Sequence, residues 1–209
     1  APFGGIVPEI ASRNHTLNLL PLIDQAVTDI EGGWDAVDAL AVTNRPGLMG
    51  SLMVGLVTVK TLAIARDRPF IAVNHLEGHI LAPFLHDSEL TAPPDLSFPH
   101  LSLAVSGGHT QLYLVRGPGV YEILGATLDD AAGEAFDKFA KMLSLGYPGG
   151  AQVDQLSQMG QREFFHFPRG LQNRPDYNFS FSGLKTQART LLQKMSQQDI
   201  SKHRADLCA

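Results

Sequence analysis

Apolar residues in the first half of the chain alternate between helical and strand-like spacing. Over 8–31 and again over 48–65 they recur at helical spacing, which predicts two helices. Mostly apolar runs at 36–42 and 69–73 predict buried strands, and the Pro-Gly pair in 43–47 predicts a turn. Strands that alternate with helices in this way indicate βαβ units on a parallel sheet.

The pattern changes at 87–99, where proline, serine and acidic residues gather. This change of composition predicts a domain boundary, so we expect one domain in 1–96 and a second in 97–209. Short strands joined by glycine-rich turns follow, and helical spacing then returns. The predicted strands are 101–105, 111–115 and 121–124, and the predicted helices are 129–145, 152–160 and 184–195.

Composition narrows the class of protein. The 209 residues are 44% hydrophobic and 18% charged, as in soluble globular proteins. We expect no segment long and apolar enough to span a bilayer, and no targeting segment. The one cysteine, Cys208, excludes an internal disulfide and suits a reducing compartment. A net charge of −5 argues against holding nucleic acid by bulk electrostatics, so an RNA partner would need a local patch or a second subunit.

Two histidines four residues apart follow the strand predicted at 69–73. If a helix begins at the end of this strand, His75 and His79 share one face and form half of a transition-metal site. The alternative is that one histidine caps the strand and the other packs in the core. The spacing alone favours that alternative, because such short motifs often occur by chance.

Two glycine pairs and a group of carboxylates could contact a polar ligand. Gly107 and Gly108 lie between two strands, so 104–110 is either an ordinary hairpin or a loop whose amides face phosphate oxygens. Asp129 and Asp130 are expected in the first helical turn, where carboxylates complement the helix dipole. Deeper in the predicted helix, Glu134 and Asp137 could bind ribose hydroxyls. Gly149-Gly150 either ends the helix or allows close approach of a ligand.

The segment 164–176 is predicted to be an ordered loop in which arginines and a histidine alternate with aromatic residues. Stacking combined with positive charge suits single-stranded nucleic acid, but neighbouring acidic residues make a purely structural loop an equal alternative. The cationic residues in and beside it are Arg162, His166, Arg169 and Arg174, and the aromatic ones are Phe164, Phe165, Phe167 and Tyr177.

Taken together, these motifs resemble those of the TsaD family, the tRNA adenosine threonylcarbamoyltransferases once described as O-sialoglycoprotein endopeptidases. The resemblance covers the whole chain, and so many motifs in one order make a chance match negligible. The motifs lie at 4–9, 13–15, 46–48, 75–79, 105–110, 130–138, 147–150, Asp176 and 179–186.

The resemblance implies an α/β fold of the actin-like ATPase class (ASKHA, ribonuclease H-like). That fold has two lobes, and 1–96 would supply the later part of the first and 97–209 the early part of the second. The chain would then be a fragment that lacks both ends. It would lack an N-terminal phosphate-binding hairpin, an acidic third metal ligand and a glycine-rich nucleotide motif. We therefore expect the fragment to bind metal and nucleotide weakly and not to turn over.

The resemblance also implies the site residues. His75 and His79 would be catalytic and would bind one iron (Fe²⁺) or zinc ion per subunit. The pocket for threonylcarbamoyl-adenylate or ATP would be lined by Ala104, Val105, Ser106, Gly107, Gly108, Asp137, Gly150 and, in some relatives only, Asp154. Arg45 stands where relatives usually have glycine, which changes the local turn.

The implied reaction transfers the threonylcarbamoyl group from threonylcarbamoyl-adenylate to the exocyclic amine of the tRNA adenosine 3′ of the anticodon. The implied partners are tRNA, an accessory actin-like paralogue and an ATPase, with no membrane partner. The expected location is the bacterial cytoplasm, or a mitochondrion or plastid for an organellar homologue. A metalloprotease is an alternative, although Glu77 would point away from the histidine face of a helix. A non-catalytic scaffold paralogue is another.

Overall fold

Contacts in the computed structural model divide the chain into two compact units, Pro2–Thr91 and Ala92–Ala209. The structure describes residues 6–85 and 96–209, so each unit is described by itself. Most of the predicted boundary segment 87–99 lies outside the described residues, as do Gly4 and Gly5 of the first family motif. The assignment of 1–96 and 97–209 to two actin-like lobes stays a prediction.

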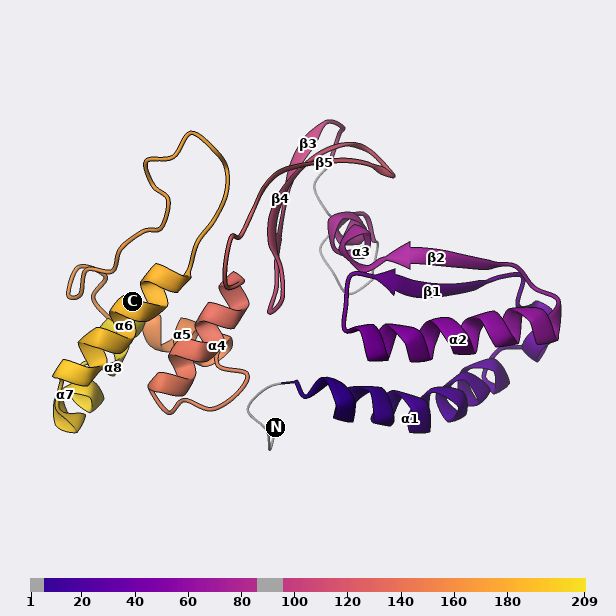
Figure 1. Cartoon of the computed structure of the whole chain (residues 1–209), viewed down its shortest axis with the longest axis horizontal. Coiled ribbons are helices and arrows are strands. Elements are labelled where there is room, and N and C mark those ends of the chain that lie inside the picture. The colour runs from indigo at the N-terminus through magenta and orange to yellow at the C-terminus, as the bar shows by residue number, and fades with distance from the viewer. Residues whose placement is uncertain (1–5, 86–95) are drawn as a thin grey trace. The chain divides into compact units, whose positions relative to one another are not determined.

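The first unit contains one parallel βαβ arrangement, as the sequence predicts. Strands β1 and β2 pair in parallel, α2 connects them, and α1 packs against α2 (Figure 1). The elements in chain order are α1 (Pro8–Thr28), η1 (Gly33–Ala36), β1 (Leu40–Arg45), α2 (Met49–Arg66), β2 (Phe70–Asn74), α3 (His75–Leu81) and η2 (Ala82–Phe84).

The strand predicted at 36–42 is misplaced. Residues 33–36 form a 3₁₀ turn, and β1 begins at Leu40, where pairing with Phe70 of β2 becomes available. The predicted turn residues Thr43 and Arg45 belong to the strand, with a register irregularity between them. The neighbouring strand therefore sets these boundaries, and the apolar run does not.

Helix α2 corrects the expectation about membrane-spanning segments. Met49–Arg66 is long and apolar enough to cross a bilayer by length and composition, because Lys60 and Arg66 are its only charged residues. One such helix is weak evidence of a span, since core helices of globular proteins have the same composition.

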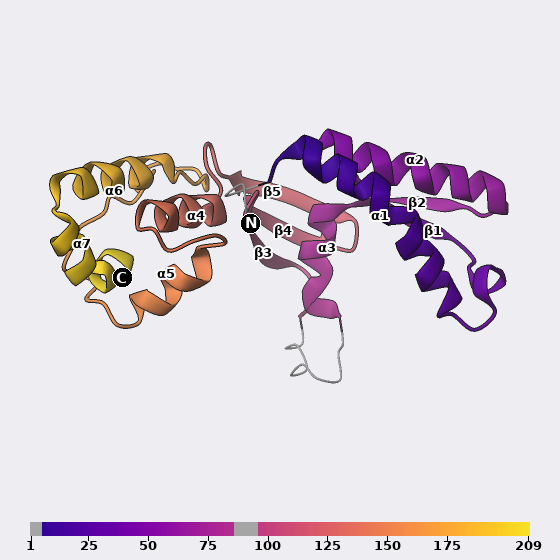
Figure 2. The same cartoon turned by 90° about the horizontal axis from the view of Figure 1, so that it is seen from below.

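The second unit is an antiparallel sheet followed by helices. The strands lie in the order β3-β4-β5, as predicted, and α4 lies between α5 and α6 and contacts both (Figure 2). The elements are β3 (His100–Val105), β4 (Thr110–Gly117), β5 (Val120–Ala126), α4 (Ala132–Met142), α5 (Gly150–Ser157), α6 (Ser182–Lys194), α7 (Gln197–Lys202) and α8 (Arg204–Cys208).

Most of the buried apolar side chains among the described residues belong to this second unit. They come from the sheet, from α4 and from the helices beside α4, so α4 is the centre of its core. The buried apolar residues of this unit are Ala104, Tyr113, Val115, Ala131, Ala132, Ala135, Ala140, Leu143, Val153, Ala188 and Leu207. Helix α4 is shorter than the predicted 129–145, and α7 and α8 lie beyond the helices that the sequence predicted.

Candidate functional site

Helix α3 presents two histidines on its exposed face. Asn74 ends β2 and caps α3, because its side-chain oxygen accepts a hydrogen bond from the Leu76 N–H at 3.0 Å. Ile80 and Leu76 point into the core, whereas His75 and His79 are exposed. The helix begins at the position that the strand-then-histidine pattern predicts.

The two imidazole rings converge. The Nε2 atoms of His75 and His79 are 3.2 Å apart, and the ring centroids are 4.6 Å apart at an interplanar angle of 71°. Two nitrogen ligands on one tetrahedral zinc ion, each about 2.0–2.1 Å from the metal, lie about 3.3 Å from each other. The spacing of the two nitrogens, which also suits a hydrogen bond between the rings, therefore fits two corners of a metal site. Within the described residues, no group of three or more His, Cys, Asp or Glu side chains could hold an ion.

The segment 104–110 contains the β3–β4 hairpin turn, which is formed by Ser106–His109. The Ser106 N–H donates to the His109 carbonyl at 2.8 Å, and the Ser106 hydroxyl accepts from the amides of Gly108 and His109 at 3.3 and 3.1 Å. A Cβ atom on Gly107 or Gly108 would meet nothing within 4 Å. Packing among the described residues therefore does not require glycine at these two positions, which leaves the backbone open to a ligand.

Helix α4 joins the hairpin turn to the second glycine pair. At its start, the Gly133 N–H donates to the Ser106 carbonyl at 3.2 Å. Four residues later, Asp137 Oδ1 accepts a hydrogen bond from the Gly149 N–H at 2.8 Å. The structure thus links Ser106, Asp137 and the Gly149-Gly150 pair; the family resemblance implies that Ser106, Asp137 and Gly150 contact one nucleotide, which stays a prediction.

Two other candidate ligand residues lie apart from this linked group. Glu134 forms an ion pair with Lys138 at 2.8 Å. Asp154 is exposed on α5 and lines a separate cavity of about 430 Å³ together with Ser157 and Gln158.

Asp129 and Asp130 do not occupy the first turn of α4, contrary to the sequence prediction. Asp129 instead accepts hydrogen bonds from the Ser180 hydroxyl and from the amides of Phe181 and Ser182, at the start of α6. Because its partners come from a helix about fifty residues later in the chain, the local charge pattern could not reveal this role.

Asp130 lies between two ammonium groups. Lys138 on α4 and Lys185 on α6 each donate to one of its carboxylate oxygens. Burial of Asp130 opposes its ionisation, but the hydrogen bonds from Lys138 and Lys185 outweigh that effect and lower the pKa of the carboxyl group. The hydrogen bond that Lys138 donates to Asp130 raises the pKa of Lys138.

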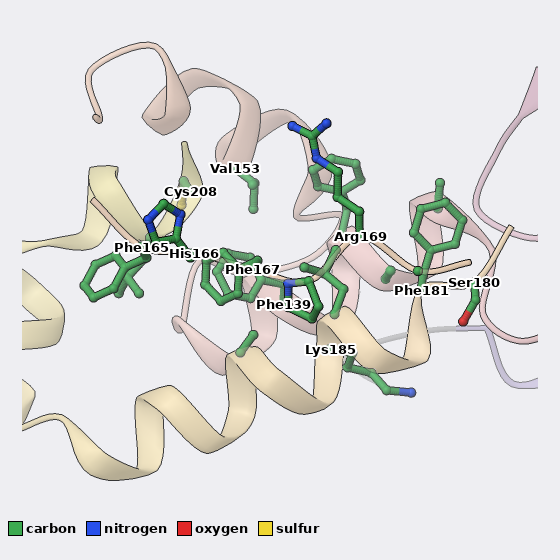
Figure 3. Close-up of a pocket in the computed structure, with 18 of the residues that line it drawn as sticks. Phe139, Val153, Phe165, His166, Phe167, Arg169, Ser180, Phe181, Lys185 and Cys208 are labelled. Atoms are coloured by element: carbon green, nitrogen blue, oxygen red, sulfur yellow. The ribbon is translucent and has the colours of Figure 1, made fainter. Parts of the chain in front are cut away.

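The loop that alternates basic and aromatic residues borders a cavity of about 620 Å³ against α4, α6 and α8 (Figure 3). Phe167 of the loop meets Phe139 of α4 edge-to-face, with ring centroids 6.4 Å apart. Figure 3 shows Arg169 and Lys185 extending on opposite sides of these rings. Arg174 forms an ion pair with Asp176 at 2.9 Å. The positive groups therefore do not converge on one point.

Residues near the C-terminal end of the chain anchor this loop, a role that the sequence pattern does not predict. Asp206 on α8 pairs with His203 at 2.9 Å and accepts a hydrogen bond from the Gln161 N–H at 3.0 Å. The Phe164 ring stacks on His203 with centroids 4.5 Å apart. The hydrogen bonds that Asp206 accepts lower the pKa of its carboxyl group; the bond from His203 has the larger effect and the bond from the Gln161 N–H the smaller.

Comparisons with known proteins identify the family. The family model described as tRNA N6-adenosine threonylcarbamoyltransferase matches residues 1–209. The curated relatives of that name include one from Bdellovibrio bacteriovorus that is 52% identical over 207 residues, which cover 99% of this chain and 60% of the relative. A Brucella suis relative is 51% identical over 211 residues, covering 100% of this chain and 56% of the relative.

A third relative, from an Anaeromyxobacter species, is 49% identical over 99% of this chain and 60% of its own length. The chain thus spans about 60% of the length of the curated relatives that it matches. A match over every residue, with this level of identity, shows that the chain belongs to the TsaD family, whose fold is the α/β actin-like (ASKHA) fold.

Proposed function

We propose that the whole protein transfers the threonylcarbamoyl group from threonylcarbamoyl-adenylate to the exocyclic amine of the tRNA adenosine 3′ of the anticodon. The names of the relatives support a tRNA-modifying transferase. The observation that carries the proposal within this chain is the 3.2 Å separation of the His75 and His79 Nε2 atoms. It is the separation that two ligands of one ion require.

In this proposal His75 and His79 hold one iron or zinc ion per subunit. Imidazole nitrogen suits both metals, and the Asn74 cap fixes the helix that carries the two rings. When bound, the ion supplies Lewis acidity that polarises the carbamoyl carbonyl or neutralises charge on the leaving phosphate. By resemblance to the family, an acidic third ligand would come from a part of the protein outside this chain.

The hairpin turn and α4 position the adenylate. Residues 104–108 approach it through backbone that bears no Cβ at Gly107 and Gly108. Asp137 and Gly150, with Asp154 on the adjoining helix, complete the nucleotide contacts that this chain provides. Because an aromatic exocyclic amine is a weak nucleophile, orientation of the two reactants contributes a large part of the acceleration.

The proposed partners are tRNA, an accessory actin-like paralogue and an ATPase, and the proposed location is the bacterial cytoplasm or an organelle.

Two rival functions, a metalloprotease and a non-catalytic scaffold, make different demands on the residues of α3. A metalloprotease needs Glu77 as a base beside the metal. Glu77 lies two residues along α3 from His75, about 200° around the helix, so it points away from the histidine face. A scaffold needs neither histidine.

Single substitutions in the full-length protein test the transferase proposal. With tRNA, threonylcarbamoyl-adenylate and the partner subunits, His75→Ala and His79→Ala should each lower the yield of modified adenosine by at least about 100-fold. Each should also lower the metal content measured by mass spectrometry. His100→Ala is the matched control: His100 is the first residue of β3, its ring stacks on Phe98, and its substitution should change neither quantity.

The rivals predict different results in the same assays. Undiminished modification by both histidine variants would leave a scaffold role. Metal-dependent cleavage of a defined peptide, lost in Glu77→Gln, would support the protease and contradict the proposal.

A further inference from the structure

Thr110 is the one buried polar side chain in the part of the chain that the structure describes, with 2% of its surface exposed. It is the first residue of β4 and pairs with Val105 across the hairpin, directly after the Ser106–His109 turn. Burying a hydroxyl without a hydrogen-bond partner destabilises the folded protein, so the partner of a buried hydroxyl indicates its role.

The Thr110 hydroxyl caps α4 from another element. Its Oγ1 accepts a hydrogen bond from the Ala132 N–H at 2.9 Å. The residue before the helix is Ala131, which has no side-chain acceptor, so α4 cannot cap itself. The Thr110 carbonyl also accepts from the Thr127 N–H at 2.9 Å, which ties the same residue to the end of β5.

The cap holds α4 against the hairpin turn. One residue beyond Ala132, a Cβ atom on Gly133 would lie 2.7 Å from the Ser106 carbonyl oxygen and 2.9 Å from the Gly107 Cα. The start of α4 therefore rests directly on the backbone of the turn. A small displacement of the helix start would move the turn, because the backbone of Gly133 packs directly on the backbone of the turn with no side chain between them.

The helix extends this constraint to the second glycine pair. Asp137 lies one turn after Gly133, and its carboxylate holds the Gly149 amide at 2.8 Å. Gly149 also packs directly on Ala140, which is fully buried. Thus one rigid helix sets the distance between the hairpin turn and Gly149-Gly150.

We propose that Thr110 is a positioning residue for the nucleotide pocket. Its hydroxyl fixes the start of α4 and thereby the spacing between the Ser106–Gly108 turn and the Asp137–Gly149 contact. The inference rests on the proposed function, because it assumes that these two places bind one adenylate.

The test uses the full-length protein with Thr110→Val, which keeps the shape and removes the hydroxyl, and Thr110→Ser, which keeps the hydroxyl. Thr110→Val should raise KM for threonylcarbamoyl-adenylate about 10-fold and leave kcat within about 3-fold, because contacts are displaced and the reacting groups are retained. Thr110→Ser should restore KM to near the wild-type value. Thermal unfolding of both variants gives the accompanying change in stability.

Three results separate the possible failures. An unchanged KM in Thr110→Val, or an equal rise in both variants, would overturn the role of Thr110 and leave the proposed function intact. A wild-type protein that does not bind the adenylate would overturn the nucleotide pocket itself. If Thr110→Val does not fold, Gly133→Ala perturbs the same contact from the helix side and should raise KM in the same way, whereas an unchanged KM would overturn the inference.

Discussion

Asp130 shows how much one residue can depend on partners that are distant in sequence. Its side chain is 14% exposed and bridges Lys138 of its own segment and Lys185 of α6. The resulting ion pairs connect α4 to α6 in the second unit. The sequence displays the negative charge of Asp130 but gives no sign that Lys185, 55 residues later, is its partner.

Substituting Asp130 by Asn should destabilise the protein. The change leaves the Lys185 ammonium, in a side chain that is 26% exposed, without its ion pair, at an expected cost of about 2 kcal/mol at pH 7. Urea unfolding of the full-length protein measures the difference. Glu122→Gln, which removes an exposed ion pair with Arg116, is the control and should cost less than about 1 kcal/mol.

This difference should depend on pH in one direction. Because the pKa of Asp130 is lowered in the folded protein, its contribution is complete above the unfolded value of about 3.9 and is lost as pH falls through the folded pKa. The stability gap between wild type and Asp130→Asn should therefore be constant from pH 5 to 7 and close below about pH 4. A gap that widens in acid would contradict this assignment.

At the scale of elements, the glycines divide into those that the fold requires and those that it does not. A Cβ on Gly149 would overlap the Cβ of Ala140, whereas a Cβ on Gly107 would meet nothing within 4 Å. Gly149→Ala should therefore cost about 1–3 kcal/mol of stability through overpacking, and Gly107→Ala less than about 0.5 kcal/mol. Parallel thermal melts of the two variants would check this, and equal losses would contradict it.

Most elements were predictable, but several of their ends were not. The alternation of apolar residues located the βαβ unit, the three-stranded sheet and α3, because these elements follow from local spacing. The start of β1 depends on its pairing with Phe70 of β2, and the start of α4 on a hydroxyl from β4. Such boundaries are set by tertiary contacts, which the sequence pattern does not display.

The candidate site divides in the same way. Two imidazoles four residues apart must share a face once a helix forms, so the sequence was enough to predict that His75 and His79 lie side by side. The capping role of Thr110 and the anchoring role of Asp206 could not be predicted, since each depends on a backbone amide from another segment. The family motifs single out Asp137 as a candidate but do not predict the hydrogen bond that it accepts from the Gly149 N–H.

At the scale of the whole molecule, net charge makes a prediction about RNA. The chain carries a net charge of −5, and Arg174 and Lys185 of the second unit have carboxylate partners. We expect the 209-residue chain alone to bind tRNA with a Kd no tighter than about 100 μM at physiological salt, at the weak end of non-specific binding.

Fluorescence anisotropy of labelled tRNA measures this affinity, and adding the proposed partner subunits should strengthen it. Submicromolar binding by the chain alone, with a steep salt dependence, would instead show a basic surface that this charge distribution does not predict.

The partners of Asp129 and Asp130 also bear on how the protein folds as it is made. Ser180 and Lys185 follow them by 51 and 55 residues, so at the usual pace of translation they emerge roughly 3–11 s later. Throughout that interval Asp129 lacks its partners at the start of α6, and Asp130 has only Lys138 of its own segment as a partner. The junction between α4 and α6 is therefore completed late, after the sheet has already left the ribosome.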